Sequence, residues 1–367
     1  MPEDRFNPTN LKVTVVGGGN IGTQFACTCA SKGYEVTMWS NKPEKFSTEL
    51  EIVDENDNVT KGILKKITSD PKEALAESGI LFVTYPAFML KDLSDTILPY
   101  VREGLMICVI PGTGGAEFSF RECMKKGAVL CGLQRVPSVA RLEQYGKRVR
   151  CEGLRDCLYV GSIPSAEAGA IAEFMSYLWG IPCVSLPNYL SVTLTPSNPI
   201  LHTTRLRTLF ADYVPGKVYD RNPLFYGEWS DASSELMIAC DGELQNMCRM
   251  LDQMDLTNVR SLKLHYESDT VEKMTAKLSS IRSLHNLTSP MIQVENGWIP
   301  DFKSRYFTAD FPYGLAILEG LAEILHADVP RIRETMDWYR QVTGDCSKLD
   351  LHAYGIHSAD DLYALYH

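Results

Sequence analysis

The sequence predicts an α/β protein in which a doubly wound parallel sheet is followed by a mainly α-helical second domain. In the first half of the chain, short β-branched runs alternate with helical stretches, which is typical of a parallel sheet covered on both faces. After about Leu186 the apolar residues recur at helical spacing almost throughout. The length of 367 residues suits more than one domain, at roughly 150 residues each. We therefore expect a first domain over residues 1–188 and a second over 189–367.

The first half contains several runs with the composition of buried strands, each followed by a turn or a helical stretch. The predicted strands are Leu11–Gly17, Tyr34–Ser40, Leu64–Asp70, Ile80–Pro86, Leu105–Gly112, Ala128–Gln134 and Cys157–Pro164. The clearest helices are Asn20–Lys32 and Ser165–Gly180. Because parallel neighbours need long crossovers, this order of elements predicts βαβ units.

The second half contains long segments with helical periodicity and two stretches without it. The predicted helices are Ser234–Met254, Thr270–Leu284, Tyr313–His326 and Val329–Val342. The predicted loops are Tyr219–Tyr226 and Thr288–Arg305, since neither shows a helical or an alternating pattern.

Composition narrows the classes of function. Asp and Glu number 46 against 36 Lys and Arg, a net charge of −10. Such an acidic chain is a poor general binder of nucleic acid or of anionic membranes. No apolar run approaches the roughly 20 residues of a membrane helix, and the N-terminus does not read as a secretory signal. The eleven cysteines are scattered, without a CxxC pair. We therefore expect a reduced, cytoplasmic protein without a metal site.

A glycine-rich turn, GGGNIG (Gly17–Gly22), lies between the first predicted strand and helix. At this position in a Rossmann βαβ unit, glycines permit the tight turn, the approach of a pyrophosphate and close helix–strand packing. The alternative is a purely structural turn. The sequence favours a dinucleotide site. Its expected contacts are Gly17, Gly19, Asn20, Ile21 and Gly22, with Pro86 at the end of a later strand.

The end of the second predicted strand indicates which dinucleotide binds. An acid about 20 residues after the glycines would accept hydrogen bonds from a ribose 2′-hydroxyl and repel a 2′-phosphate. This chain instead has Ser40, Asn41 and Lys42. Hydroxyl, amide and ammonium groups suit a phosphate, so the sequence favours NADP over NAD. The alternative is that Lys42 is a solvated loop residue and that NAD binds.

The segment TPSNPILHTTRL (Thr195–Leu206) places a histidine near a helix start. Asn198 before Pro199 predicts a helix cap followed by the first helical residue. His202 then lies one turn into the helix, where the dipole disfavours an imidazolium and a nearby carboxylate would favour it. This opposition suits a general acid–base near neutral pH. Taken alone, a structural histidine is the commoner case.

A second segment, SRYFTADFPYGL (Ser304–Leu315), combines a cation, an acid and aromatic residues ahead of a helix. Arg305 could hold a substrate carboxylate with two parallel hydrogen bonds, although a solvated arginine is commoner. Asp310 could orient His202 and stabilise its charged form. The alternative role of Asp310 is a helix cap ahead of Pro312.

Together these two segments resemble the signature pair of the opine dehydrogenase family, which includes octopine and nopaline dehydrogenases. The resemblance spans almost the whole chain, including FYGEWSDASSELMIACDGE (Phe225–Glu243). It also includes VTGDC (Val342–Cys346), where the family more often has an aromatic residue in place of Cys346.

The resemblance implies a Rossmann domain and a helical domain that together join an amino acid to a 2-oxo acid. The imine would be reduced by NAD(P)H, a reversible reaction on CH–NH donors (EC 1.5.1 type). It also implies His202 as the acid–base with Asp310 as its partner. Arg305 would bind the amino-acid carboxylate, Asn198 would position the substrate, and the site is expected in the cleft between the domains.

Two other functions remain open. One is the reduction of a 2-oxo acid to a 2-hydroxy acid by an enzyme of the same superfamily. The other is a non-catalytic dinucleotide-binding sensor, which would need no His–Asp–Arg set. The sequence is compatible with a homodimer, and it leaves the identities of the amino acid and the 2-oxo acid open.

Overall fold

The computed structural model describes residues 4–282, 284–345 and 350–366. The chain divides into two compact units. The first runs up to Thr193 and also includes Tyr366, and the second extends from Leu194 to Leu365. The boundary predicted between residues 188 and 189 lies a few residues before this division. Each unit is described by itself below.

The first unit is built on an eight-stranded sheet in the order β12-β11-β8-β7-β6-β1-β2-β5. The strands are β1 (Lys12–Val16), β2 (Glu35–Trp39), β5 (Lys66–Thr68), β6 (Ile80–Val83), β7 (Met106–Val109), β8 (Val129–Leu133), β11 (Leu158–Ile163) and β12 (Cys183–Ser185). Each predicted strand is confirmed, with shorter ends. The expectation of a wholly parallel sheet is wrong at one pair, because β11 runs antiparallel to β8. The other neighbours are parallel.

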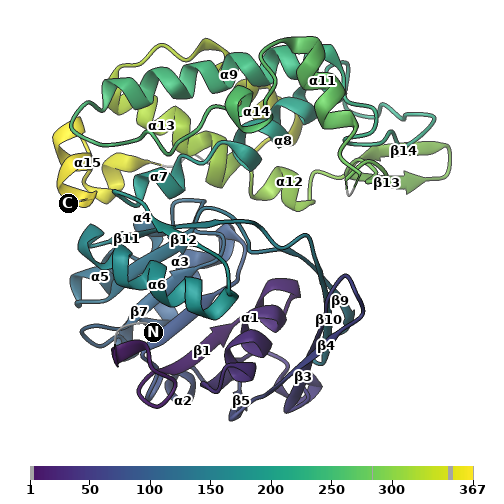
Figure 1. Ribbon diagram of the computed structural model, residues 1–367. Coiled ribbons are helices and arrows are strands. Elements are labelled where there is room, and N and C mark those ends of the chain that lie inside the picture. Colours follow the sequence, from purple (N-terminus) through teal and green to yellow (C-terminus); the bar gives the residue numbers. More distant parts are fainter. Residues whose placement is uncertain (1–3, 283, 346–349, 367) are drawn as a thin grey trace. The chain divides into compact units, whose positions relative to one another are not determined.

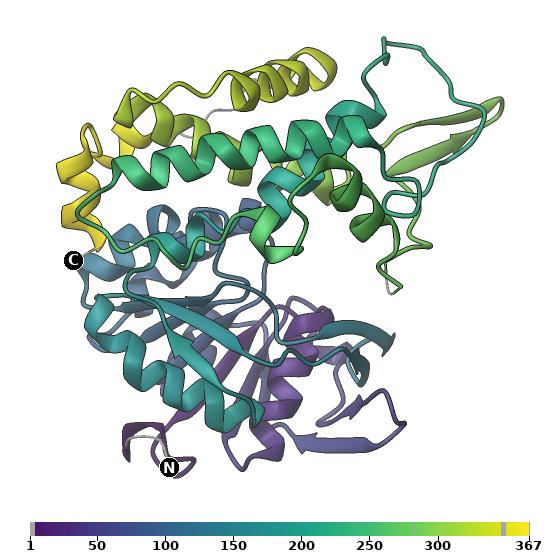
Figure 2. The same cartoon turned by 45° about the horizontal axis from the view of Figure 1, so that its top comes forward.

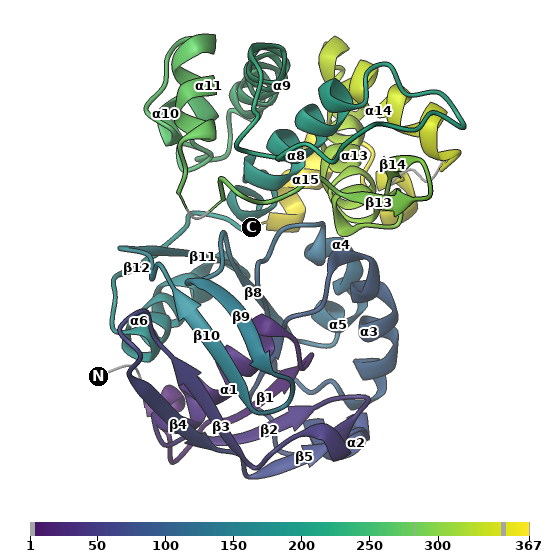
Figure 3. The same cartoon turned by 90° about the vertical axis from the view of Figure 1, so that its right-hand side faces the viewer.

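Helices cover both faces of this sheet, as a doubly wound fold requires. Figure 3 shows α1 (Asn20–Ser31) and α6 (Ala168–Trp179) on one face, and α2 (Pro71–Leu75), α3 (Leu90–Ile97) and α5 (Arg121–Lys125) on the other. The central strands β6 and β7 are buried along their whole length. Burial on both faces explains why these strands are continuous apolar runs in the sequence.

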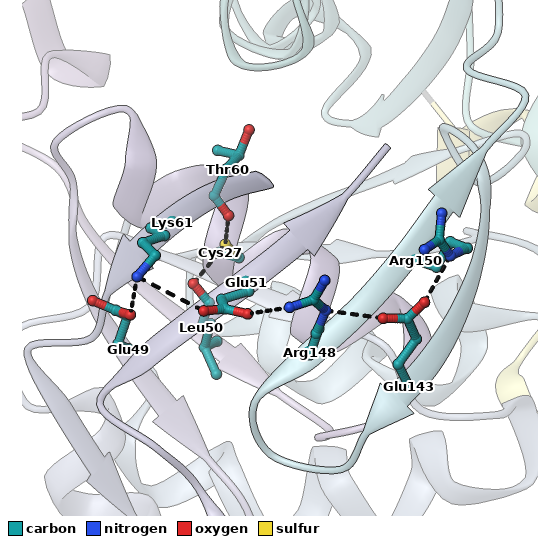
Figure 4. Close-up of polar contacts among 9 residues, drawn as sticks. All are labelled: Cys27, Glu49, Leu50, Glu51, Thr60, Lys61, Glu143, Arg148 and Arg150. Atoms are coloured by element: carbon teal, nitrogen blue, oxygen red, sulfur yellow. Dashed lines mark hydrogen bonds and ion pairs between the residues drawn. The ribbon is translucent and has the colours of Figure 1, made fainter. Parts of the chain in front are cut away.

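A second, four-stranded sheet, which the sequence did not predict, covers the outer side of α1. Its order is β4-β3-β10-β9, and its strands are β3 (Glu49–Val53), β4 (Val59–Ile63), β9 (Val139–Gln144) and β10 (Arg148–Glu152). It packs closely on α1, because a Cβ on Gly62 would lie 2.5 Å from the Cys27 carbonyl oxygen. The Cys27 thiol donates to the Leu50 carbonyl oxygen at 3.4 Å (Figure 4).

The outer face of this sheet carries alternating charges that connect its strands (Figure 4). Arg148 on β10 pairs with Glu51 on β3 and with Glu143 on β9, each at 2.9 Å. Glu143 also accepts from Arg150 at 2.6 Å, and Lys61 on β4 pairs with Glu49 on β3 at 2.7 Å. Individual surface pairs contribute little to stability, but opposite charges on facing strands favour this register over a shifted one.

The second unit is mainly helical, with the 20-residue α9 at its centre (Figures 1 and 2). Its helices are α8 (Ser197–Leu209), α9 (Asp231–Met250), α10 (Leu262–His265), α11 (Val271–Ser279), α12 (Arg305–Thr308), α13 (Ala316–Leu325), α14 (Pro330–Thr343) and α15 (Ala359–Tyr366, whose last residue belongs to the first unit). α8, α11, α13 and α14 all pack against α9.

The predicted loop Thr288–Arg305 is wrong, because it contains the hairpin β13 (Met291–Val294) and β14 (Gly297–Pro300). This hairpin projects from one end of the helical unit in Figures 1 and 2. Trp298 also forms a β-bridge with Tyr219 in the other predicted loop. In the part of the chain that the structure describes, no helix has the length and apolar character needed to cross a membrane.

Candidate nucleotide-binding and acid–base sites

The glycine turn lies directly after β1 and has the geometry that its sequence predicts. Gly17 has φ +102°, a conformation that favours glycine. A Cβ on Gly22 would overlap the Gly17 carbonyl oxygen, so only glycine allows α1 to approach β1 this closely. A Cβ on Gly19 would meet no atom within 4 Å. Gly19 therefore has open space beside it at the start of α1, where free N–H groups favour an anion.

Residues that the sequence did not single out hold this turn in place. The Thr84 hydroxyl donates to the carbonyl oxygens of Val16 at 2.9 Å and of Gly17 at 3.1 Å. The Phe46 ring packs against Gly18 and makes an edge-on contact with Tyr145, with ring centroids 5.3 Å apart. The only sequence signal for Thr84 is its place at the end of a predicted strand.

The other residues predicted to contact the dinucleotide take different positions. The Asn20 side chain accepts from the Leu142 N–H at 2.8 Å, so it ties α1 to β9. Ile21 is half-buried and packs against the core. Pro86 precedes a 3₁₀ turn just after β6. Asn20 and Ile21 thus have structural contacts within the unit.

The residues that directly follow β2 are polar, and some of them are exposed. Ser40 is buried, and its hydroxyl accepts from the Lys42 N–H at 3.2 Å. The side chains of Asn41 and Lys42 are exposed. No acid lies at positions 40–43. This arrangement leaves an exposed ammonium group and amide at the position where a ribose would be recognised in a Rossmann unit.

In the second unit, α8 carries His202. The prediction that Asn198 caps this helix is wrong, because the helix begins at Ser197 and its cap position is Pro196, with φ −80° and no side-chain cap bond. The backbone of Pro196 is already helical, so α8 begins before Asn198. Asn198 is an exposed residue of the first turn. His202 still lies near the N-terminal end of the helix.

Asp310 comes from a distant segment and meets the His202 ring. The Nδ1–H of His202 donates to Asp310 Oδ2 at 2.8 Å. Asp310 occupies the cap position of the π-helical turn η6 (Phe311–Leu315), as the alternative predicted, but its side chain makes no capping bond there. Gly314 in η6 lies against Pro199 of α8, where a Cβ would come within 3.0 Å. This close approach brings the two segments together.

The His202–Asp310 pair lies in a partly buried, aromatic environment. The side chains of His202 and Asp310 are 14% and 17% exposed. The Tyr306 ring lies 4.7 Å from the His202 ring, edge-on. The Tyr226 hydroxyl lies 3.1 Å from His202 Nε2. Neither tyrosine was predicted, although both lie within segments that carry the family resemblance.

Arg305 and Asn198 are exposed, unlike the partly buried His202–Asp310 pair. Arg305 is exposed at the start of α12, directly before Tyr306, and Asn198 is exposed four residues before His202. The structure thus brings His202 and Asp310 into contact and leaves these two polar residues solvent-accessible on the same unit. A carboxylate-paired imidazole can take up and return a proton, and an accessible guanidinium can bind a carboxylate.

Among the described residues, no group of three or more His, Cys, Asp or Glu side chains is arranged to hold a metal ion. Cys346, a position at which the sequence departs from the family resemblance, lies outside the described residues.

Comparison with known proteins assigns the two units to different profiles. Residues 185–343 match the profile described as NAD/NADP octopine/nopaline dehydrogenase, alpha-helical domain. Residues 12–117 match the profile of the NAD-dependent glycerol-3-phosphate dehydrogenase N-terminus. The first covers most of the helical unit, including His202 and Asp310, and the second covers the glycine turn.

Similarity to individual proteins extends over nearly the whole chain. Octopine dehydrogenase of Mizuhopecten yessoensis is 26% identical, with 93% of this chain and 92% of the relative covered. Tauropine dehydrogenase of Arabella iricolor is 24% identical, with 90% and 91% covered. A solved octopine dehydrogenase with NADH and pyruvate superposes with a TM-score of 0.83 at 22% identity, covering 96% of this chain and 98% of that one. The predicted fold class is therefore confirmed.

Proposed function

We propose that the chain is a member of the opine dehydrogenase family, which condenses an amino acid with a 2-oxo acid and reduces the product with NAD(P)H. The observation that carries this proposal is the 2.8 Å hydrogen bond between His202 and Asp310. It joins two segments that are 108 residues apart and supplies a carboxylate-oriented imidazole in the helical unit. The open Gly19 turn of the first unit supports dinucleotide binding.

The chemistry requires proton transfer as well as a hydride. Attack of the amine on the 2-oxo acid gives a carbinolamine, and its hydroxyl must be protonated to leave as water. We assign this proton to His202, whose imidazolium Asp310 stabilises and orients. When bound, NAD(P)H would supply the hydride that reduces the imine. In the reverse direction His202 would accept the proton.

Both substrates carry carboxylates, which an acidic protein must bind through a few placed groups. We assign the amino-acid carboxylate to Arg305, since a guanidinium can make two parallel bonds to it. Asn198 would position the substrate near His202. The exposure of both side chains is consistent with contact to a ligand.

We further propose that the cofactor is NADP rather than NAD. Ser40, Asn41 and Lys42 present no carboxylate to a ribose, and Lys42 offers a cation to a 2′-phosphate. Separate KM values for NADH and NADPH test this assignment. We expect the lower KM for NADPH, and Lys42→Ala should raise the KM for NADPH more than that for NADH. A clear preference of the wild type for NADH would contradict it.

The reaction is tested by a spectrophotometric matrix of 2-oxo acids against amino acids with each cofactor. Pyruvate and L-arginine are sensible first members, because octopine dehydrogenase has been solved with each. We expect cofactor oxidation that requires both substrates and a secondary amine as product, identified by its mass. Oxidation with a 2-oxo acid alone would instead favour the 2-hydroxy-acid reductase.

A further inference from the structure

The His202 ring has a second partner. Asp310 holds Nδ1, and the Tyr226 hydroxyl lies 3.1 Å from Nε2. The carboxylate of Asp310 can only accept, so in the neutral ring Nδ1 carries the proton and the Tyr226 hydroxyl donates to Nε2. In the charged ring Nε2–H donates, and the same hydroxyl can turn to accept until the leaving hydroxyl of the substrate takes its place. Tyr226 can therefore serve both protonation states of His202.

The loop that carries Tyr226 is held by a buried cation. Arg205 lies one turn after His202 on α8 and is 3% exposed. Its guanidinium donates to the carbonyl oxygens of Phe225 at 2.9 Å and of Glu228 at 2.8 Å, on either side of Tyr226. It also lies 5.5 Å from the centre of the Trp229 ring. Burial lowers the pKa of Arg205 to about 10, which still leaves it charged at neutral pH.

The side chain of Glu228, which is partly exposed, also makes hydrogen bonds within this loop. Glu228 accepts from the Leu224 N–H at 2.6 Å and from both terminal nitrogens of Arg221. The Arg221 guanidinium is the main reason that the pKa of Glu228 is lowered to about 2. Residues 221–229 are thus fixed at both ends and in the middle. Because Tyr226 lies between these anchored residues, the hydrogen bonds restrict the position of its hydroxyl.

We propose that Tyr226 is a positioning residue for His202, fixing the ring through Nε2 and stabilising its imidazolium, with Arg205 holding the loop that presents it. This inference rests on the proposed role of His202 as acid–base. The titratable and charged groups near the His202–Tyr226 pair are Asp310, Tyr306, Tyr266 and Arg205. Tyr226 is 6% exposed, and burial raises the pKa of its hydroxyl above the ordinary value. It therefore stays neutral and acts as a dipole.

The direction of its effect follows from the strengths of the two hydrogen bonds. A bond from a charged N–H is stronger than one to a neutral ring nitrogen. Tyr226 therefore stabilises the charged ring more than the neutral one. Its removal should therefore disfavour the charged ring relative to the neutral one.

The test compares Tyr226→Phe with the wild type by NMR titration of the histidine-labelled full chain. The His202 signal is assigned by its absence in His202→Gln. We expect the midpoint of the His202 titration to be lower in Tyr226→Phe and kcat to fall roughly tenfold. The high-pH limit of kcat/KM for reductive condensation should move to lower pH by the same amount as the midpoint. The dissociation constant of the reduced cofactor should not change. Tyr219→Phe is the matched control, because its hydroxyl bonds to Asp212 elsewhere in the unit.

Equal titration midpoints and equal pH profiles for Tyr226→Phe and the wild type would overturn the inference and leave Tyr226 a packing residue. A higher kcat in Tyr226→Phe would also overturn it, since the hydroxyl would then be blocking Nε2. If Tyr226→Phe does not fold, 3-fluorotyrosine at position 226 must lower the midpoint, because its hydroxyl is a weaker acceptor. The titration tests the role of Tyr226 separately from the proposed function. Full activity in His202→Gln would refute the proposed function, and the titration would still show whether Tyr226 stabilises the charged ring.

Discussion

At the scale of single residues, the pairing of Asp310 with His202 makes a direct prediction. Asp310→Asn keeps the shape of the side chain, but its amide can donate to Nδ1 and so favour the other tautomer of the ring. Under the proposed function, we expect kcat to fall by roughly 10²- to 10⁴-fold, the range that general acid–base groups contribute.

Steady-state kinetics with the best substrate pair measures this loss. Asp301→Asn is the matched control, because the Asp301 carboxylate accepts from the Lys303 N–H after the hairpin and not from His202. Activity within twofold of the wild type in Asp310→Asn would show that the carboxylate has no role in proton transfer.

A second prediction at this scale concerns Asp241 in α9, which the mechanism does not use. It is 3% exposed and accepts from the Leu262 N–H at 2.8 Å. Burial raises the pKa of Asp241 from 3.8 to about 6. Because the pKa is higher in the folded state, the stabilising contribution of this group is complete below its unfolded pKa. That contribution is lost as the pH rises through about 6.

Asp241→Asn should remove this part of the pH dependence. Between pH 4 and 7 the unfolding free energy of the wild type should fall, relative to that of Asp241→Asn, by on the order of 2–3 kcal/mol. Denaturant unfolding of both proteins at the two pH values measures the difference. Parallel pH profiles would mean that Asp241 is solvated in the folded state.

At the scale of elements, two glycines of the turn before α1 should behave differently. A Cβ on Gly22 would overlap the Gly17 carbonyl oxygen, whereas one on Gly19 would meet nothing. We expect Gly22→Ala to lose roughly 1–3 kcal/mol of stability through overpacking. Gly19→Ala should melt like the wild type but bind NAD(P)H more weakly, since its methyl group would occupy the place of the pyrophosphate.

Thermal melting and cofactor titration of both variants separate the two effects. Unchanged cofactor affinity in Gly19→Ala would place the pyrophosphate elsewhere. Unchanged stability in Gly22→Ala would mean that α1 can move away from β1 at little cost.

The elements differ in how far the sequence could predict them. β6 and β7 were predictable because burial on both faces makes them apolar throughout. β4 was missed because most of its residues face solvent, with only Gly62 buried. Its pairing partner β3 lies beside β10, although β3 and β10 are far apart in the sequence, and periodicity within one segment does not detect such contacts. The hairpin β13–β14 was missed because most of its residues are partly or fully exposed, so its strands lack a buried apolar face.

Some residues of the candidate site could be predicted from the sequence and others could not. His202 and Asp310 were chosen because their residue types carry proton chemistry, and the structure places them in contact. Tyr226 could not be chosen, since a tyrosine in an aromatic segment is usually a packing residue. Under our proposal its position depends on Arg205, a buried residue whose guanidinium donates to carbonyl and hydroxyl oxygens. Sequence gives no sign of such burial.

At the scale of the whole molecule, the chain returns to its first unit at Tyr366, after the second unit has ended at Leu365. The Tyr366 hydroxyl donates to Glu117 Oε1 at 2.6 Å, and the Thr193 hydroxyl donates to the same oxygen at 2.6 Å. Glu117 is fully buried, and this burial raises its pKa. Thr193 is the last residue before the division, so one carboxyl group binds both points at which the chain leaves or rejoins the first unit.

Loss of the Tyr366 hydroxyl should therefore weaken the first unit as well as the end of the chain. Tyr366→Phe removes one of the two hydroxyl groups that donate to Glu117 Oε1 and leaves that of Thr193. We expect a loss of about 1–2 kcal/mol in the free energy of unfolding. Since the raised pKa of Glu117 makes its contribution greatest at low pH, Glu117→Gln should flatten the decline in stability as the pH rises. Chemical unfolding of the two variants and the wild type, followed at pH 5 and pH 8, measures both effects. A Tyr366→Phe protein as stable as the wild type would show that the end of the chain is held by packing alone.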